Sequence, residues 1–352
     1  MITNSASSFF ARTRDAKKVM VLDLGFLGDT VHLLPSLWMV RQAYPQAELH
    51  AAVAAHIVTL MECTPWVDKT WGYMRYPRHA TLRENINMIR RLRREKFDVL
   101  INLNGSDRSS WLTFLSGAKE RLGRLPNDGG PLFWKRMFTA HVQHPFDAEL
   151  DCVQRCRCLE KSGFPFAGPE FHVEIKPENL RGTDISDADQ GSYFHVSPFT
   201  TADYKELASA QLAELIAALG RNFPEKKLVL SCAPAPRELA KMEKLIALLP
   251  QKPWRVFAGN LNLVQITAVI KYSALHFCGD TGTLHLAVMT QTPVVAWFWP
   301  NPALKILVPN NEICRVIVGS NPPEETFLGG IATDKLAQAA REISDLGSRK
   351  AD

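Results

Sequence analysis

The chain has 352 residues, more than a single hydrophobic core usually serves, so two domains are expected. Its 46% apolar and 22% charged residues are typical of a globular protein, and no apolar run approaches the roughly 18 residues of a membrane span. A net charge of +5 suits an anionic substrate or membrane surface and does not indicate a nucleic-acid-binding protein.

Residues 1–17 contain no apolar core of a secretory signal, and we expect them to form a loose lead-in. Seven cysteines, an odd count scattered along the chain, indicate a reducing compartment, so a cytoplasmic location is expected. Cys152, Cys156 and Cys158 have a spacing that fits no common zinc or disulfide frame, and we predict no metal site there.

The first predicted strand covers residues 18–24 and is followed by a turn over 25–29 and a helix from near Thr30. The turn lacks the G-x-G-x-x-G pattern, and the next strand, 49–53, is not followed by the acidic residue that binds ribose. A dinucleotide site is therefore not expected. We predict instead that the turn displays Asp29 above the sheet, although Asp29 could equally cap the helix, and the two roles are compatible.

A helix is predicted over residues 80–96, with arginines at 90, 91, 93 and 94 that form either a solvated face or a contact with anionic lipid. The strand 98–103 is followed by the polar stretch 104–108, again just past a strand's carboxyl end. Residues 121–146 are predicted to form a long loop with an interrupted helix. A domain boundary is expected within 164–192.

The second half restarts the pattern with a strand at 193–196 and a loop that contains Thr200, Thr201 and Lys205. Two hydroxyl donors and a cation after a strand end suit a diphosphate. A helix over 210–219 and strands over 227–231 and 256–259 follow.

Residues 275–300 are predicted to form a β-loop-α-β unit, with strands 275–278 and 294–298 around a helix at 284–289. The helix amino terminus favours an anion, whereas Asp280 beside it would repel one. Asp280 is therefore predicted to accept hydrogen bonds from sugar hydroxyls. The alternative is that Asp280 caps the helix and His285 faces the core.

The predicted organisation is thus a lead-in (1–17), two α/β domains (18–175 and 176–332), and a C-terminal helix and tail (333–352). Each half presents polar loops at strand ends. We therefore expect two doubly wound domains that face a central cleft.

Three motifs resemble one known family: GFLGDTVHLLP at 25–35, TTADYK at 200–205 and GDTGTLHLAV at 279–288. They are similar to the ADP-heptose:lipopolysaccharide heptosyltransferases of glycosyltransferase family 9, which have the GT-B fold, and the resemblance spans about 18–300. It implies inverting, metal-independent transfer of a heptose-like sugar, ADP-heptose above all as donor, to lipopolysaccharide core or a related glycan, without a cofactor. Peripheral contact with the inner membrane is a further expectation.

On the matching positions Asp29 would be the general base and Lys205 would hold the departing diphosphate. The acceptor-side candidates are Gly28, His32, Asn104, Ser106 and Arg108. The expected donor-binding residues are Thr200, Thr201, Lys205, Leu261, Asp280, Thr281, Gly282 and His285.

The sequence departs from the family in three places: Pro236 near an expected Glu, with Glu238 two residues on; Trp297 and Trp299 around the last strand; and the stretch 301–303. Two alternatives remain open at this point. One is a GT-B-like sugar-nucleotide epimerase, and the other is a non-catalytic sugar-nucleotide-binding homologue.

Overall fold

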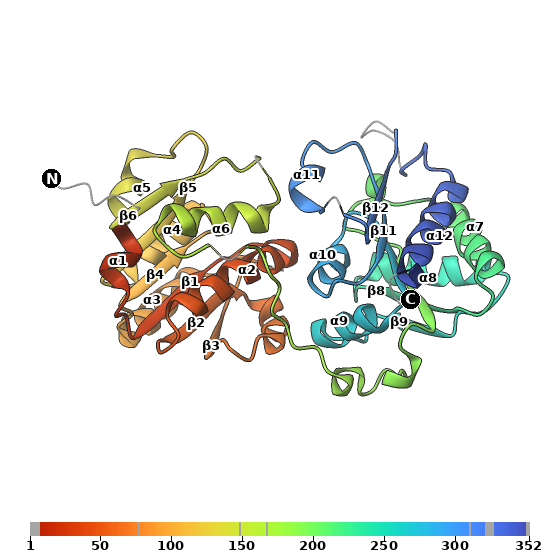
Figure 1. Ribbon diagram of the computed structural model, residues 1–352, viewed down its shortest axis with the longest axis horizontal. Coiled ribbons are helices and arrows are strands. Elements are labelled where there is room, and N and C mark those ends of the chain that lie inside the picture. Colours follow the sequence, from red (N-terminus) through yellow and green to blue (C-terminus); the bar gives the residue numbers. More distant parts are fainter. Residues whose placement is uncertain are drawn as a thin grey trace. The chain divides into compact units, whose positions relative to one another are not determined.

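The computed structural model describes residues 8–76, 78–147, 149–166, 168–309, 311–320 and 327–349. The chain divides into an N-terminal unit, Met1–Glu174, and a C-terminal unit, Ile175–Asp352. Each unit is a parallel six-stranded sheet covered by helices on both faces (Figure 1). The boundary expected from sequence lay between 175 and 176.

The sheet of the N-terminal unit has the strand order β3-β2-β1-β4-β5-β6, and every neighbouring pair is parallel. Its central strands are continuous apolar runs, as expected when both faces of a sheet are covered. The strands are β1 Lys18–Leu22, β2 Glu48–Ala54, β3 Lys69–Tyr73, β4 Val99–Asn102, β5 Glu120–Leu125 and β6 Ala140–Gln143.

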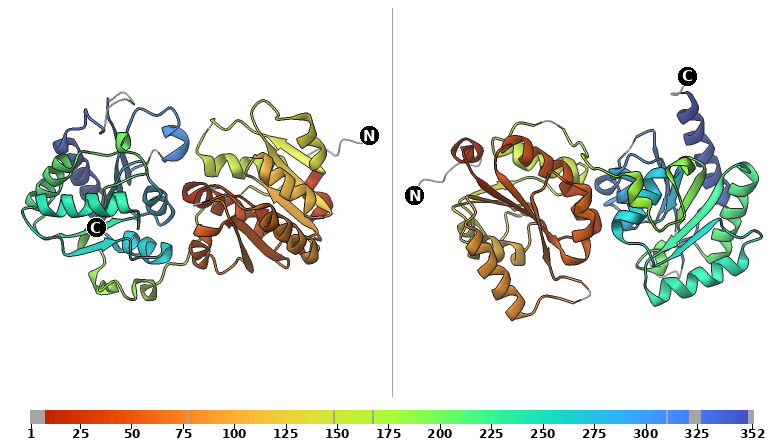
Figure 2. Two further views of the ribbon diagram at one scale, coloured as in Figure 1. Left: turned by 180° about the vertical axis from the view of Figure 1, so that it is seen from behind. Right: turned by 90° about the horizontal axis from the view of Figure 1, so that it is seen from below.

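Two layers of helices cover this sheet. Helices α2 (Leu27–Ala43) and α6 (Asp151–Lys161) pack against each other, whereas α4 (Asp107–Leu115) lies between α3 (Leu82–Glu95) and α5 (Leu132–Met137). The helices of this second layer lie in front of the sheet in the rear view of Figure 2. A 3₁₀ segment, η2 (Ala55–Cys63), follows β2.

Part of the segment 1–17, which was expected to be a loose lead-in, is helical. Residues 1–7 lie outside the described part of the chain, but Phe9–Thr13 form helix α1. Phe9 is fully buried and stacks on Phe164, and the Phe10 N–H donates to the Ser162 carbonyl (3.1 Å). Phe9 is therefore a core residue, Phe10 is partly buried against Tyr44 and Phe164, and the expectation of a loose segment is wrong for 9–13.

The C-terminal unit repeats the topology of the first, with the order β12-β11-β10-β7-β8-β9 and parallel pairing throughout. Its core joins the sheet to helix α12, which buries Leu336, Ala340 and Ile343. The strands are β7 Tyr193–Ser197, β8 Lys227–Cys232, β9 Arg255–Ala258, β10 Leu275–Cys278, β11 Val294–Phe298 and β12 Cys314–Val318. The helices are α7 Ser209–Asn222, α8 Pro236–Leu248, α9 Leu263–Tyr272, α10 Gly282–Met289, α11 Leu304–Leu307 and α12 Thr333–Arg349, with 3₁₀ turns η3 Pro177–Leu180, η4 Asp187–Asp189 and η5 Asp203–Lys205.

The long loop predicted at 121–146 is wrong, because this stretch holds most of β5, the short helix α5 and the strand β6. The basic residues of β5 suggested an exposed loop. Arg124 is nevertheless buried in this strand: its Nη2 donates to Gln154 Oε1 (2.7 Å), and its guanidinium lies 3.6 Å from the ring centre of Phe146. Strand β12 was also not predicted.

Candidate functional site

Both sheets place polar residues at the point where the strand order reverses. In the N-terminal unit these residues follow β1 and β4, and in the C-terminal unit they follow β7 and β10, which are adjacent parallel strands in each case. Open parallel sheets bind ligands outside the carboxyl ends of their strands at this point. Each unit therefore has one candidate site, described separately below.

Asp29 lies in the first turn of α2, which begins at Leu27, three residues earlier than predicted. Its Oδ2 accepts the Phe26 N–H (2.6 Å), and the side chain stays 42% exposed. A Cβ at Gly25 would lie 2.2 Å from Asp29 Cβ, so only glycine lets the turn approach the carboxylate this closely. Asp29 thus caps the helix and presents a carboxylate to solvent at the same time.

The buried Arg155 organises this site and was not identified from sequence. Its guanidinium contacts three carboxylates, forming an ion pair with Asp23, a 2.7 Å bond from Nε to Asp151 Oδ2, and a 3.6 Å contact from Nη2 to Asp29 Oδ1. Asp23, which is fully buried, also accepts the Gly25 N–H (2.7 Å). The cation therefore ties the end of β1 and the start of α2 to α6.

The pKa values show how tightly these charges depend on one another. Burial raises the pKa of Asp23 more than the charge of Arg155 lowers it. Burial is also the largest single influence on the pKa of Asp151 and acts to raise it, but Arg155, His32 and Arg124 together outweigh it, and the net shift is downward. Burial opposes the charge of Arg155, yet its surrounding carboxylates raise its pKa well above the ordinary value. The guanidinium is a permanent positive charge beneath the Asp29 carboxylate.

Two acceptor-side candidates join this network. Asn104 Nδ2 donates to Asp23 Oδ1 (3.1 Å), and Ser106 Oγ donates to Asn104 Oδ1 (2.5 Å). Arg108 lies further along α4, where its Nη1 is 3.3 Å from His79 Nδ1 on the surface. Gly28 is in the first turn of α2, whereas His32 is buried one turn later, which leaves it almost no surface for an acceptor.

In the C-terminal unit, Lys205 and Asp280 form an ion pair. Lys205 Nζ lies 2.6 Å from Asp280 Oδ2, and both side chains are mostly buried. Asp280 is therefore not the isolated, anion-repelling carboxylate inferred from sequence, because its charge is balanced by the lysine. The pair stands just before α10, which begins at Gly282 with Thr281 as its N-cap residue. The Thr281 side chain makes no capping hydrogen bond, so it does not compete with a ligand for the first amides of the helix.

The two threonines differ. Thr200 is buried, and its hydroxyl donates to the Ala202 carbonyl (2.9 Å) while its N–H donates to Glu206 Oε1 (2.7 Å). Thr201 is exposed. Glu206 is in turn held by Lys241 (2.6 Å) and Arg237 (2.8 Å). Thr200 thus shapes the loop, and Thr201 is the hydroxyl that remains accessible.

The tryptophans that depart from the family pattern lie beside this loop and beside the turn at Gly279. A Cβ at Gly279 would lie 2.9 Å from Trp297 Nε1 and 3.0 Å from Thr200 Cγ2, so glycine is needed for this close approach. Trp299 meets Tyr204 edge-on, with 5.5 Å between ring centres. Trp299 therefore packs on the segment that carries Lys205, whereas Trp297 lies beside the turn at Gly279.

The remaining donor-side residues have different environments. His285 is 7% exposed and belongs to the buried face of α10, as the core alternative predicted. Leu261 is half-buried just before α9. Glu238, in the first turn of α8, accepts the Ala233 N–H (2.9 Å), and burial raises its pKa.

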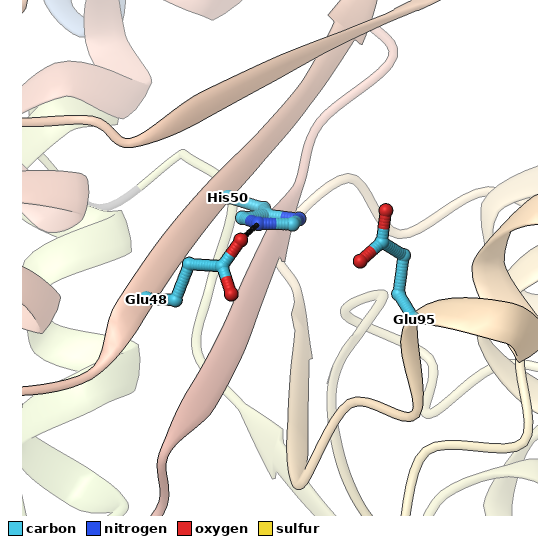
Figure 3. A group of neighbouring side chains, drawn as sticks. All are labelled: Glu48, His50 and Glu95. Carbon is cyan, nitrogen blue, oxygen red and sulfur yellow. Dashed lines mark hydrogen bonds and ion pairs between the residues drawn. The ribbon is translucent and has the colours of Figure 1, made fainter.

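Among the described residues, one group of histidine and carboxylate side chains has its ligand atoms close enough to hold a metal ion, and the clustered cysteines are not part of it. Cys152, Cys156 and Cys158 are free and buried, and burial raises the pKa of each thiol, to about 11 for Cys152. Glu48, His50 and Glu95 converge at the opposite end of the sheet (Figure 3), where Lys18 Nζ lies 2.9 Å from both carboxylates. The lysine ammonium already occupies the place of a cation.

The two doubly wound units, each with a site at its strand-order reversal, have the architecture of the GT-B fold. The sequence pattern of glycosyltransferase family 9 (heptosyltransferase) matches residues 85–326, and the chain belongs to this family. Both the suspected family and the predicted fold class are thus confirmed. Because the chain belongs to a glycosyltransferase family, this assignment replaces the two alternatives, an epimerase and a non-catalytic homologue.

Three similar proteins illustrate the relationship. The lipopolysaccharide core heptosyltransferase OpsX of Haemophilus influenzae is 25% identical over 306 residues, which cover 85% of this chain and 84% of that protein. A family 9 glycosyltransferase from Veillonella parvula has a TM-score of 0.79 at 18% identity, and the match covers 93% of this chain and 97% of that chain. Escherichia coli heptosyltransferase WaaC with ADP-2-deoxy-2-fluoro heptose has a TM-score of 0.73 at 18% identity, covering 92% and 99%. The structural likenesses show the shared fold. In the described residues, no helix has the length and apolar character needed to cross a bilayer.

Proposed function

We propose that this enzyme transfers a heptose from ADP-heptose to a lipopolysaccharide core acceptor, with inversion at the anomeric carbon and without a metal ion. The similarity to OpsX, a lipopolysaccharide core heptosyltransferase, supports the acceptor class. The likeness to WaaC, whose structure holds a fluorinated ADP-heptose, supports the donor class. The assignment of residues rests on the two sites of this chain.

Asp29 is the general base in this proposal. Its carboxylate takes the proton of the acceptor hydroxyl as that oxygen bonds to the anomeric carbon, and the bond from that carbon to the diphosphate breaks. A sugar hydroxyl is a poor nucleophile, and a positioned base contributes roughly 10²–10⁴-fold to the rate. The Phe26 N–H and Arg155 hold the carboxylate in place, and 42% of the side chain remains exposed for the acceptor. Asn104 and Ser106, linked to the same network, are placed to contact acceptor hydroxyls.

The observation that carries the donor assignment is the convergence of Lys205 and the amino terminus of α10. The ammonium of Lys205 reaches Asp280, two residues before Gly282, so both positive groups lie beyond the ends of β7 and β10. A cation and open helix amides stabilise the negative charge that grows on the departing ADP. Thr201 adds a hydroxyl donor on the same loop.

Asp280 has a different role from the one its charge alone suggests. One carboxylate oxygen orients Lys205, and the carboxylate can also accept hydrogen bonds from hydroxyls of the donor sugar. Magnesium sites usually combine about one or two carboxylates with substrate phosphates. Here Asp280 already has a cationic partner, which favours charge stabilisation by Lys205 over stabilisation by a metal ion.

We place the enzyme in the cytoplasm, in peripheral contact with the inner membrane. Six of the seven cysteines are buried free thiols and Cys232 is a half-buried one, which fits a reducing compartment. A lipopolysaccharide acceptor carries acyl chains, so transfer to it takes place at a membrane surface.

The test is transfer by the full chain from ADP-heptose, with UDP- and GDP-sugars as comparison donors, to a lipopolysaccharide core that lacks heptose. We expect acceptor-dependent release of ADP and a product whose anomeric configuration is opposite to that of the donor. Release of ADP without transfer, a product of retained configuration, or preference for another nucleotide would each contradict the corresponding part of the proposal.

A further inference from the structure

An exposed apolar surface covers part of the helical layer α3–α5. We call it the aromatic patch: Trp111 and Phe114 of α4 together with Leu132 and Phe133 of α5. Their side chains are 48%, 42%, 80% and 46% exposed. Trp111 stacks near Phe133 (6.4 Å between ring centres) and meets Phe114 edge-on (6.3 Å), so the patch is contiguous. Apolar groups of this size gathered on one face usually mark an interaction site.

The two helices that carry the patch are held together firmly. Trp134 of α5 is buried and its Nε1 donates to Asp107 Oδ1 in the first turn of α4 (2.6 Å). Its two preceding neighbours, Leu132 and Phe133, are thereby presented outward. The exposed rings are a consequence of this packing and do not belong to an unstructured loop.

The three helices of this layer are strongly basic. Helices α3, α4 and α5 contain eight arginines and lysines against three acidic residues. All three acids already have partners: Glu84 pairs with Arg78, Glu95 with Lys18 and Lys69, and Asp107 with Trp134. The basic residues of the three helices are exposed: Arg83, Arg90, Arg91, Arg93, Arg94, Arg108, Lys135 and Arg136.

We propose that this face docks on an anionic membrane surface, with the aromatic patch in the headgroup region and the basic side chains on the lipid phosphates. Aromatic rings favour the interface, and each nearby basic side chain adds attraction to an anionic leaflet. The inference rests on the proposed function in one respect, because a lipid-borne acceptor requires an enzyme at the membrane. Trp111 follows the acceptor-side residue Arg108 by one helical turn, so the docked face borders the acceptor end of this unit.

A second copy of this chain is the competing occupant of the patch. Symmetric pairing would bring the same basic face of two copies together, and like charges across an interface are unfavourable. The charge of this face therefore favours an anionic lipid surface over self-association.

The experiment is flotation of the full chain with vesicles of phosphatidylcholine alone or mixed with phosphatidylglycerol. We expect binding to the mixed vesicles only, weakened by salt because exposed charges are screened. Trp111→Ser/Phe133→Ser and, separately, Lys135→Gln/Arg136→Gln should each raise the vesicle dissociation constant by about tenfold or more. The second double variant changes only exposed side chains and keeps the test valid should the first fail to fold.

The matched control is Leu248→Ser/Lys244→Gln, which removes an exposed apolar and an exposed basic side chain from α8 of the other unit. It should bind vesicles as the parent does. Failure of the parent to bind, equal binding by the patch variants, or a dimer that the Trp111→Ser/Phe133→Ser variant abolishes without any vesicle binding would overturn the proposal. Vesicle binding needs neither donor nor acceptor, and transfer to a delipidated acceptor should persist in the patch variants, so the two proposals fail independently.

Discussion

Replacing Asp29 with asparagine separates the catalytic role of this residue from its role in capping helix α2. Asparagine keeps an oxygen that can accept the Phe26 N–H, now 2.6 Å from the carboxylate, but it cannot take a proton from an acceptor hydroxyl. The general-base role predicts a fall in kcat of roughly 10²–10⁴-fold, or about 3–5 kcal/mol of transition-state stabilisation.

The expected change in folding stability is much smaller. The lost negative charge at a helix amino terminus is worth about 0.3–1 kcal/mol, and a half-exposed ion pair such as the 3.6 Å contact with Arg155 adds about 1 kcal/mol or less. The free energy of unfolding should therefore fall by no more than about 2 kcal/mol. Donor affinity should hold, because the proposed donor contacts lie in the C-terminal unit.

Steady-state release of ADP with saturating acceptor measures kcat, calorimetry measures donor binding, and urea denaturation measures stability. Glu84→Gln is the matched control, because Glu84 occupies the same position in the first turn of α3, accepts the Thr81 N–H (2.7 Å) and pairs with an arginine. This control should lose little stability and retain kcat. A fall in kcat of less than roughly tenfold in Asp29→Asn would refute the general-base role.

Four further predictions concern charge. Lys205→Met should weaken ADP-heptose binding and lower kcat, each by about tenfold or more, since the diphosphate charge exists in the ground state and grows in the transition state. Unchanged affinity and kcat would show that Lys205 does not bind the diphosphate. Asp280→Asn should retain ADP affinity, because it releases the lysine from its 2.6 Å ion pair, but it should lose sugar transfer. In the parent enzyme, transfer should persist in excess EDTA. Abolition of transfer by EDTA with rescue by magnesium or manganese would make Asp280 a metal ligand. Arg155→Met should destabilise the N-terminal unit by about 3–5 kcal/mol in urea denaturation, because Asp23 is left buried without its cation. A second change of Asp23→Asn should recover part of the loss. An unchanged free energy of unfolding in Arg155→Met would contradict the network. His276 of β10 is fully buried, with its Nδ1 2.9 Å from His195 Nδ1. Burial lowers the pKa of His276 to about 3, below the value of about 6.5 in the unfolded chain, so its contribution to stability is complete above pH 6.5 and is lost as the pH falls toward 3. Urea midpoints between pH 7.5 and 5 should show this slope, and His276→Gln should reduce it.

Strands with apolar residues on both faces could be predicted from sequence alone. Strands β10 and β11 have the bounds that the pattern of apolar runs and turn residues predicts, Leu275–Cys278 and Val294–Phe298. Such runs reflect burial on both faces, a property that is written locally into consecutive residues. The polar residues at their carboxyl ends were visible for the same reason.

Strand β5 shows where this reasoning stops. Its Arg124 is buried because Gln154 and Phe146, which come later in the chain, accept and cover its guanidinium. From sequence, a basic residue in a short run signals an exposed loop. Only the tertiary contacts reverse that expectation, and the long loop predicted at 121–146 is wrong for this reason.

The sequence by itself determined the repeated α/β pattern, the strand ends that carry function, and the motifs that point to the family. The tertiary structure alone decided how the charges are paired. Arg155 reaches Asp23 across 132 positions of the chain, and Lys205 reaches Asp280 across 75. Apolar periodicity is a property of neighbours in sequence, whereas the partner of a buried charge depends on which strand ends the fold brings together, so no local pattern could identify either pair.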